Sequence, residues 1–171
     1  DAADVQTDEI AGLVSILLDG QYSHGGFSYS YGANTDDEDW QSTAYAMMTL
    51  GRLDQATYQD ELNRAGYYIG ATQDASGGWV YTSGNHYPEI GGECVAGLYF
   101  TTDDVTSVLV DDDFTSQSDV DAYNAANGTN YTFGYDAFGS IQDGIDAVSG
   151  STVNVAAGTY VEDLSIGISL N

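Results

Sequence analysis

The sequence contains almost no basic residues. Arg52 and Arg64 are its only two Lys or Arg residues, against 27 Asp and Glu residues, and the formal net charge at pH 7 is −25. A charge of this sign and size repels phosphate backbones and anionic lipid surfaces. We therefore expect no nucleic-acid partner and no membrane insertion, and look for partners among cations, glycans and protein surfaces.

Cysteine and long apolar runs are also scarce. Cys94 is the single cysteine, so it cannot form an internal disulfide, and its small and apolar neighbours predict a buried, inert thiol. No run approaches the roughly 18 to 20 apolar residues of a membrane-spanning helix. The first residues, 1–4, lack the basic head and apolar stretch of a signal peptide. We expect either that a leader has been removed or that the chain is a piece of a longer protein.

A nine-residue pattern occurs twice in the first half of the chain. Residues 21–29 read Gln-Tyr-Ser-His-Gly-Gly-Phe-Ser-Tyr, and residues 73–81 read Gln-Asp-Ala-Ser-Gly-Gly-Trp-Val-Tyr. Two copies indicate a repeat architecture. The glycine pairs predict positive φ or a close backbone approach, and the aromatic residues are expected to cover helix ends. The repeat-loop residues are Gly25, Gly26, Phe27, Gly77, Gly78 and Trp79.

Apolar residues at helical spacing surround both loops. They predict helices from Thr7 to about residue 20, from Trp40 to Gly51, from Tyr58 to Ile69 and from Ile90 to Phe100, with Thr7 as a cap and a turn at residues 53–55. The order is helix, loop, helix, turn, and then the same again. A helical hairpin of this kind cannot bury both of its faces alone, so such units normally stack on neighbours.

Residues 7–102 resemble the α/α-toroid repeats of terpenoid cyclases and of protein prenyltransferase β subunits. In those families, Gln-x-x-x-Gly-(Gly/Ser)-(Trp/Phe) loops alternate with helices. Residues 42–50, Ser-Thr-Ala-Tyr-Ala-Met-Met-Thr-Leu, are similar to the Thr-Ala-x-Ala-x-x-x-Leu helix that follows each such loop. The resemblance implies a helical domain over residues 1–104, built from two hairpins where the family rings hold several more.

The second part of the chain differs from the first in composition and in the secondary structure that it predicts. Residues 107–111 are β-branched and predict a strand, and a long polar stretch follows. Phe138, Ile141, Ile145 and Val148 fall on one helical face within residues 138–148. Residues 152–155 and 158–170 then alternate as strands do.

Residues 107–171 resemble the opening of right-handed parallel β-helix proteins of the pectin-lyase-like group, and the match is close over residues 138–164. There, a Phe-x-(Thr/Ser)-Ile-Gln-x-x-Ile-x-Ala-Val helix caps the coil, and a Thr-Val-x-Val-x-x-Gly-x-Tyr pair forms the first rung. The resemblance implies that residues 105–171 form a β-rich domain with one capping helix, which makes the whole chain α+β.

A single rung would leave a row of unpaired backbone groups and an uncovered apolar face. We expect either the rest of a longer protein or another copy of this chain to add strands there. The residues expected to form this assembly edge are Tyr160, Leu164, Ile166, Ile168 and Leu170.

The chain lacks the catalytic residues of the toroid and β-helix families that it resembles. Cyclases that act by protonation carry an Asp immediately before the Thr-Ala helix, where this chain has Ser42. Prenyltransferases bind zinc through Asp, Cys and His, but Cys94, His24 and His86 have no short ligand spacing. Lyases built on β-helices use Lys or Arg as the base, and none follows Arg64. Glycoside hydrolases use paired carboxylates, which that fold supplies from later rungs, so we expect no catalysis within this chain.

Acidic and amide side chains suggest a metal site and a modification. Asp36, Asp37 and Asp39 could supply oxygen ligands to Ca²⁺, although the EF-hand spacing is absent and a solvated acidic loop is the alternative. Asn127 and Asn130 begin two adjacent glycosylation sequons, while Asn127 with the following glycine also fits an ordinary turn. Tyrosines near the repeat loops could stack on sugars or on a partner subunit, or simply cap helix ends.

Together, these features predict a non-enzymatic extracellular or cell-surface structural module that assembles into fibres or arrays by strand addition and helical packing. Its partners would be copies of itself or the rest of a longer repeat protein, with glycans as further ligands. The only cofactor suggested is Ca²⁺. The alternative is a fragment of a secreted carbohydrate-active enzyme or carbohydrate-binding protein whose catalytic rungs lie outside this chain.

Overall fold

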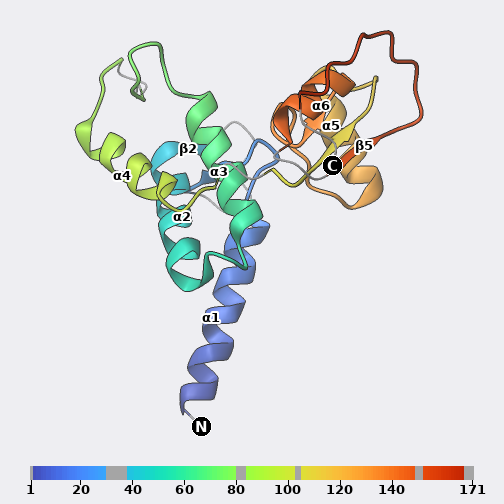
Figure 1. The fold of residues 1–171 in the computed structure, drawn as a ribbon. Helices are drawn as coiled ribbons and strands as arrows, with labels where there is room; N and C mark the ends of the chain where they lie inside the picture. The colour runs from blue at the N-terminus through green and yellow to red at the C-terminus, as the bar shows by residue number, and fades with distance from the viewer. Residues whose placement is uncertain (1, 30–37, 80–83, 103–104, 149–151, 168–171) are drawn as a thin grey trace. The chain divides into compact units, whose positions relative to one another are not determined.

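The computed structural model describes residues 2–29, 38–79, 84–102, 105–148 and 152–167. The chain divides into two compact units, Asp1–Thr102 (unit 1) and Asp103–Asn171 (unit 2). Unit 1 is mainly helical, and unit 2 combines a small sheet with helices (Figure 1). The predicted α+β class is therefore confirmed.

Four helices are seen in the described residues of unit 1. They are α1 (Ala2–Asp19), α2 (Trp40–Asp54), α3 (Gln59–Ala71) and α4 (Pro88–Leu98). Their order agrees with the predicted alternation of helices and loops, but two of the predicted ends are wrong. α1 begins well before Thr7, which is therefore not its cap, and α2 continues through two of the three residues that were expected to form a turn.

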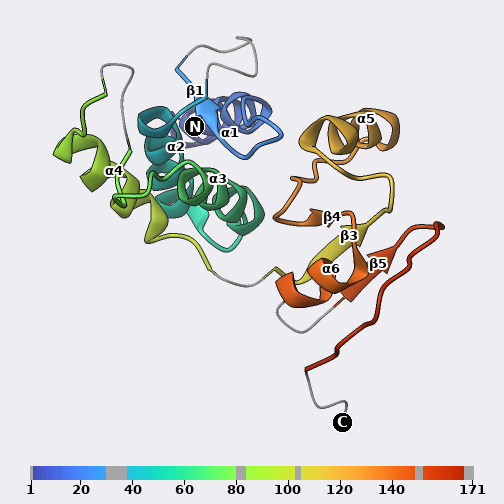
Figure 2. The ribbon, with the colours of Figure 1, turned by 90° about the horizontal axis from the view of Figure 1, so that it is seen from above.

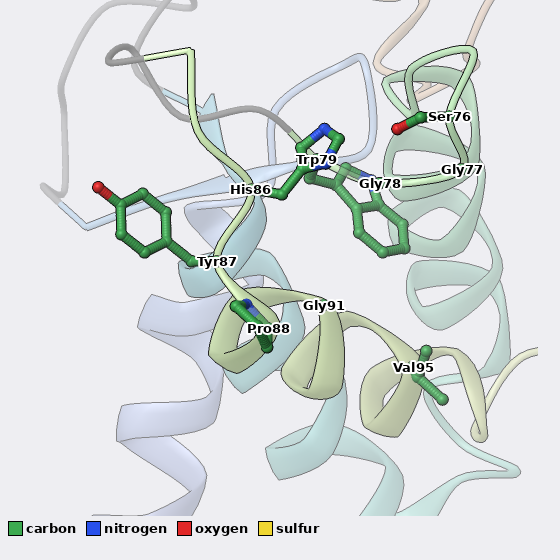
Figure 3. Close-up of a pocket in the computed structure, with 9 residues that line it drawn as sticks. All are labelled: Ser76, Gly77, Gly78, Trp79, His86, Tyr87, Pro88, Gly91 and Val95. Atoms are coloured by element: carbon green, nitrogen blue, oxygen red, sulfur yellow. The ribbon is translucent and has the colours of Figure 1, made fainter.

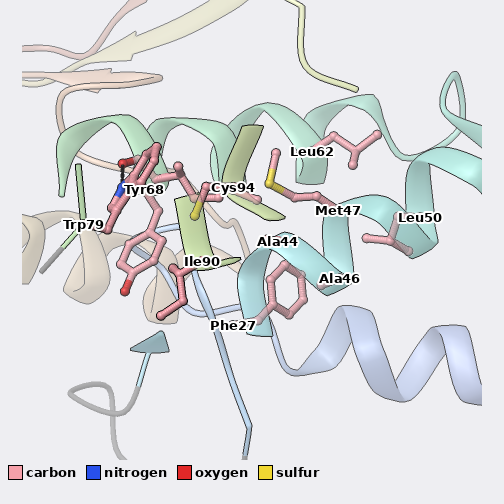
Figure 4. Close-up of a cluster of buried hydrophobic side chains, with 12 residues drawn as sticks. Phe27, Ala44, Ala46, Met47, Leu50, Leu62, Tyr68, Trp79, Ile90 and Cys94 are labelled. Carbon is pink, nitrogen blue, oxygen red and sulfur yellow. Dashed lines mark hydrogen bonds between the residues drawn. The ribbon is translucent and has the colours of Figure 1, made fainter. Parts of the chain in front are cut away.

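The buried side chains of unit 1 form one core, and α2 contacts both α3 and α4. Gly97 allows α4 to approach α2 closely, because a Cβ at that position would lie 3.3 Å from the Cα of Ala44. Two short strands, β1 (Phe27–Ser28) and β2 (Glu38–Asp39), pair antiparallel and hold the first repeat loop against the start of α2. The core comprises Phe27, Ala44, Ala46, Met47, Leu50, Leu62, Ala65, Tyr68, Ile69, Trp79, Ile90 and Cys94 (Figure 4).

A three-stranded parallel sheet organises unit 2. β3 (Ser107–Val110) is the central strand, with β4 (Ala137–Phe138) on one side and β5 (Thr152–Val155) on the other. The ladder between β3 and β5 runs from the Ser107–Thr152 pair to the Val110–Val155 pair. The strands predicted near residues 107–111 and 152–155 are therefore confirmed.

Helices cover both faces of this sheet (Figure 2). Val120 of α5 (Gln117–Asn127) belongs to one buried cluster with Leu109. α6 (Ile141–Ala147) packs on the other face, against Val108 and Val110. Because successive side chains of a strand point to opposite faces, the single strand β3 contributes to both layers.

Three predictions for unit 2 are wrong. The unit carries two helices rather than one capping helix, because α5 forms in the polar stretch. Within α5, only Val120 and Asn124 are buried. Phe138 belongs to β4 rather than to a helix. Residues 158–167, which alternate like a strand, form none. We call residues 156–167 the tail.

Beyond Ala156, whose N–H still donates to the carbonyl of Val110, side chains rather than a strand ladder hold the tail to the rest of unit 2. The Asp112 carboxylate accepts a hydrogen bond from the N–H of Thr159 at 2.9 Å. The Glu162 carboxylate accepts from the N–H groups of Ile141 and Gln142, each at 2.9 Å. These are N–H groups of the first turn of α6, which have no partner within the helix. Glu162 therefore caps α6 from a distant part of the chain.

Candidate functional site: the two repeat loops and the edge of β5

The two repeat loops share the same backbone geometry. In loop 1 (residues 21–27), the N–H of Tyr22 donates to the carbonyl of Gly26 at 2.9 Å, and the N–H of Gly25 donates to the carbonyl of Tyr22 at 2.8 Å. In loop 2 (residues 73–79), the corresponding bonds, 52 positions later, are both 2.9 Å long. The sequence repeat is therefore a structural repeat.

A glutamine side chain closes each loop. Gln21 Nε2 donates to the carbonyl of Gly25 at 2.9 Å, and Gln73 Nε2 donates to the carbonyl of Gly77 at 2.6 Å. The two glycines have φ angles of +93° and +84°, which glycine adopts without the strain that a Cβ brings. The predicted positive φ is confirmed for the first glycine of each pair.

The aromatic residue that ends each loop is buried. Phe27 is 3% exposed and Trp79 is 6% exposed. The indole Nε1–H of Trp79 donates to the carbonyl of Ile69 at 2.8 Å, and so satisfies a carbonyl in the last turn of α3. The N–H of Phe27 donates to the hydroxyl of Thr43 at 2.9 Å, in the first turn of α2. These residues cover helix ends as predicted.

α3 covers loop 1 closely. A Cβ at Gly25 would lie 2.1 Å from the carbonyl oxygen of Arg64, and a Cβ at Gly26 would lie 3.0 Å from the ring of Tyr68. The backbone of loop 1 is therefore pressed against α3, with no space for a side chain at either glycine.

In loop 2, the first glycine has no equivalent cover among the described residues, whereas the second is covered by the His86 ring, which lies 3.3 Å from the position of a Cβ on Gly78. A Cβ at Gly77 would approach only the Nε2 atom of Gln73, at 3.9 Å, and Gly77 is exposed whereas Gly25 is buried. In loop 1, by contrast, Gln21 Nε2 also donates to the backbone carbonyl of Glu61 in α3, at 2.8 Å, and so ties the loop to its covering helix. Loop 2 thus keeps the shape of loop 1, but its cover among the described residues is the side chain of His86 at Gly78 and not a helix.

A pocket of about 370 Å³ lies between loop 2 and α4 (Figure 3). Its walls combine backbone of the two glycines in loop 2 with apolar side chains from α4. Val95 on its wall is 64% exposed. The lining residues are Ser76, Gly77, Gly78, Trp79, His86, Tyr87, Pro88, Gly91 and Val95.

An Asp–His pair lies beside this pocket. Asp74 Oδ2 is 2.7 Å from His86 Nε2, and Asp74 Oδ1 accepts from the backbone N–H and the hydroxyl of Ser76. The hydrogen bond from Ser76 and then that from His86 hold the pKa of the Asp74 carboxyl below its usual range. Because the Ser76 hydroxyl donates to the acid and not to the histidine, the three residues do not form a nucleophile–base–acid triad. They fix the shape of loop 2.

The three residues considered for zinc do not meet. His86 pairs with Asp74, while His24 Nδ1 lies 3.5 Å from a Glu38 carboxylate oxygen. Cys94 is buried in the core, and burial, with a smaller contribution from the neighbouring carboxylate, raises its thiol pKa to about 11. The predicted buried thiol is confirmed. In the described ranges, no group of three or more His, Cys, Asp or Glu residues could hold a metal ion.

The predicted calcium ligands lie largely outside the described residues, which exclude Asp36 and Asp37. Asp39 is described, and its Oδ1 accepts the N–H of Ser42 at 2.7 Å, so this carboxylate caps α2. Calcium binding stays a prediction.

Both predicted glycosylation sites, Asn127 and Asn130, are exposed. Asn127 is the last residue of α5, and Gly128 follows it with a φ of +66° as a left-handed helix cap. The turn anticipated at Asn127 is present, and glycosylation stays a prediction.

The outer edge of β5 is a second candidate site. The N–H of Ala156 donates to the carbonyl of Val110 at 2.8 Å, which shows that alternate backbone groups of this segment face the β3 side. Those of Val153 and Val155 therefore point away from β3. Within the described part of unit 2, no strand pairs with this edge, and Val155 is 45% exposed.

This position corrects the predicted assembly edge. Tyr160, Leu164 and Ile166 belong to the tail, which is not a strand, while Ile168 and Leu170 lie outside the described residues. The tail loses its strand character because its backbone is bound by side chains of Asp112 and Gln142. The open strand edge belongs to β5.

A comparison with protein-family models finds no match, and comparisons with curated proteins and with solved structures find none either. The resemblances to toroid and β-helix families therefore rest on the motifs alone. Among the helices described, none is long and apolar enough to cross a membrane.

Proposed function

We propose that this chain is a non-enzymatic structural module of an extracellular or cell-surface assembly, and that β5 receives a further strand from another copy or from the rest of a longer repeat protein. The observation that carries the proposal is the open edge of β5. Val153 and Val155 direct backbone donors and acceptors outward, and such a row of groups is a template for strand addition.

The sequence of β5 favours an edge that pairs with a further strand. Exposed edge strands are commonly protected by lysine, proline or a bulge. β5 reads Thr-Val-Asn-Val and pairs with β3 in an unbroken register. Under this proposal, unit 2 is the opening of a β-helix whose next rung pairs with β5, and unit 1 is a toroid-like stack of two hairpins.

The charge of the chain suits an extracellular assembly. A net charge of −25 keeps neighbouring assemblies apart and soluble, and it attracts cations, with Ca²⁺ as the candidate. The exposed sequons at Asn127 and Asn130 would place glycans on unit 2.

The proposal is tested by removing the outward N–H of Val155. Proline is tolerated in an edge strand when the lost N–H faces solvent, so Val155→Pro is expected to keep the fold of unit 2 while blocking strand addition. Val155→Thr keeps the N–H and the branched side chain, and it serves as the matched control. Negative-stain microscopy is expected to show fibres or arrays for the wild type and Val155→Thr, and none for Val155→Pro. Fibres of Val155→Pro that match the wild type would overturn the proposal.

A second candidate function is carbohydrate binding within a larger secreted enzyme or binding protein. The pocket beside loop 2 favours it, because it combines apolar walls with the polar edges of His86 and Ser76. The expected observation is a wild-type chain that stays monomeric and whose tryptophan fluorescence shifts when neutral oligosaccharides are added.

A further inference from the structure

The two repeats correspond beyond their loops. With the same offset of 52 positions, α1 aligns with α3, and Asp8-Glu9 falls on Asp60-Glu61. Three apolar residues of α1, Ile10, Leu13 and Ile16, align in the same way with Leu62, Ala65 and Tyr68 of α3. We call the three α1 residues the α1 stripe.

The aligned residues differ sharply in exposure. The α1 stripe is 46%, 67% and 53% exposed at its three positions, whereas the aligned residues of α3 are 0%, 1% and 9% exposed. The first turns of α1 extend past the ends of α2 and α3 (Figure 1). An apolar surface that is buried in the second repeat is therefore left open in the first.

The buried face of α3 is the face that covers loop 1. The backbone N of Ala65 lies 3.3 Å from the position of a Cβ on Gly25, and the ring of Tyr68 covers Gly26. Loop 2 has the same closed conformation without a covering helix. Among the described residues, α1 thus presents the aligned apolar face with no loop against it, and loop 2 has the His86 ring at Gly78 but no helix over Gly77.

We propose that the α1 stripe of one copy packs on loop 2 and its pocket in a second copy, and so reproduces the contact between α3 and loop 1. This inference rests on the proposed function, because it supplies a second contact within the same assembly. The occupant is a second copy because α1 carries the aligned residues, and because the chain continues from α4 into β3 rather than into a third hairpin.

The internal contact predicts the details of the contact between copies. Gln73 Nε2 is expected to reach the backbone carbonyl of Glu9, as Gln21 reaches that of Glu61. Gly77 is expected to lie against Gly12, which aligns with Arg64 and has no described residue within 4 Å of its Cβ position. Because the two surfaces differ, the contact is heterologous and generates rings or filaments.

The contact has to form between two strongly acidic chains. Each copy carries a net charge of −25, so the contact is expected to strengthen when salt screens the repulsion. The test therefore uses sedimentation velocity over a range of protein concentrations, at low salt and at about 1 M NaCl, where the Debye length is about 3 Å.

The test is made in the Val155→Pro background, which separates this contact from strand addition at β5. Leu13→Glu places a charge in the α1 stripe, and Val95→Glu places one in the wall of the pocket. Both side chains are largely exposed, so neither change is expected to unfold unit 1. Ser15→Glu and Tyr99→Glu add the same charge at exposed positions outside the α1 stripe and the pocket, and are the matched controls.

The background variant and the two controls are expected to form oligomers that grow with concentration and with salt. Leu13→Glu and Val95→Glu are each expected to weaken association about tenfold or more. An equimolar mixture of the two is expected to form a dimer and nothing larger, because one intact α1 stripe can then meet one intact loop 2. Circular dichroism and melting of each variant check the fold.

Three results would overturn this inference: a background variant that stays monomeric throughout, a mixture that stays monomeric, or association of both charged variants at the level of the controls. None of them affects the strand-addition proposal, which rests on the wild type against Val155→Pro. An oligosaccharide that shifts Trp79 fluorescence while the mixture stays monomeric would assign the pocket to a glycan instead.

Discussion

The carbonyl oxygen of Arg64 occupies the space that a side chain at Gly25 would need, since a Cβ there would lie 2.1 Å from it. Gly77 repeats the left-handed conformation of Gly25, with a φ of +84° against +93°. Of the described residues, however, only the side chain of Gln73 comes near a Cβ at Gly77, at 3.9 Å. A repeat loop can therefore adopt its closed conformation without a helix packed against its first glycine.

Alanine at these two glycines is expected to have unequal effects on the free energy of unfolding. Gly77→Ala is expected to lower the free energy of unfolding by about 1–2 kcal/mol, because the only cost is the strain of a Cβ at positive φ. Gly25→Ala has the same strain and must also displace α3, so we expect a loss of more than about 3 kcal/mol. Urea denaturation followed by circular dichroism measures both. Equal losses would show that α3 does not restrict loop 1.

The two tryptophans provide a second matched comparison. Trp79 Nε1–H donates to the buried carbonyl of Ile69 at 2.8 Å, while Trp40 Nε1–H donates to the Thr72 hydroxyl at 2.9 Å in an exposed position. Trp79→Phe leaves the carbonyl of Ile69 with only the longer bond from the Thr72 hydroxyl, at 3.3 Å, and we expect it to lower the free energy of unfolding by about 1–3 kcal/mol. We expect less than about 1 kcal/mol for Trp40→Phe. Chemical denaturation decides, and a larger loss at Trp40 would contradict the assigned burial.

Local patterns in the sequence were sufficient for the repeat loops and for most of the helices. Gln21 and Gly25 recur as Gln73 and Gly77 because the glutamine closes the loop onto the glycine carbonyl. β5 was predicted because valine and polar residues alternate along it, and Val153 packs against the buried cluster on the α6 side of the sheet. These features depend on residues close together in the chain, which a single sequence displays directly.

The missed features depend on contacts between distant residues or on a weak local signal. The tail alternates like a strand, but Glu162 caps α6 from 20 and 21 positions away and Asp112 binds Thr159 from 47 positions away. No local pattern encodes these bonds. α5 did carry a signal, because Ser116 and Asp119 have the spacing of a helix-capping pair and their side chains are bonded at 2.9 Å.

The candidate site also combines features that local sequence predicts with features that depend on distant contacts. The Asp74 and Ser76 pair is a local turn that the Asp-x-Ser spacing allows, whereas the contact of Asp74 with His86 requires the folded chain. The difference in cover between Gly25 and Gly77 is also a tertiary property. The sequence shows two copies of one loop pattern, and only the structure shows that Gly25 is covered by a helix and Gly77 is exposed.

Cys94 is expected to be unreactive in the folded chain. Its pKa of about 11 leaves roughly one thiolate in a thousand at pH 8, and its side chain is fully buried. A chromogenic disulfide reagent at pH 8 is therefore expected to label the native chain orders of magnitude more slowly than the chain in 6 M guanidinium. Cys94→Ala supplies the background rate. Rapid labelling of the native chain would show that α4 separates readily from α2.

Glu162 is expected to hold the tail to unit 2 through α6. Its two carboxylate oxygens accept the N–H groups of Ile141 and Gln142, and a charged acceptor at a helix N-terminus is stronger than a neutral one. Glu162→Gln is expected to lower the free energy of unfolding by about 1 kcal/mol and to speed hydrogen exchange at both amides. Asp163→Asn removes the same charge at an exposed neighbouring position and is expected to change neither. If both variants behave alike, the loss would come from net charge, and the tail would be held by the Thr159 and Ser165 contacts instead.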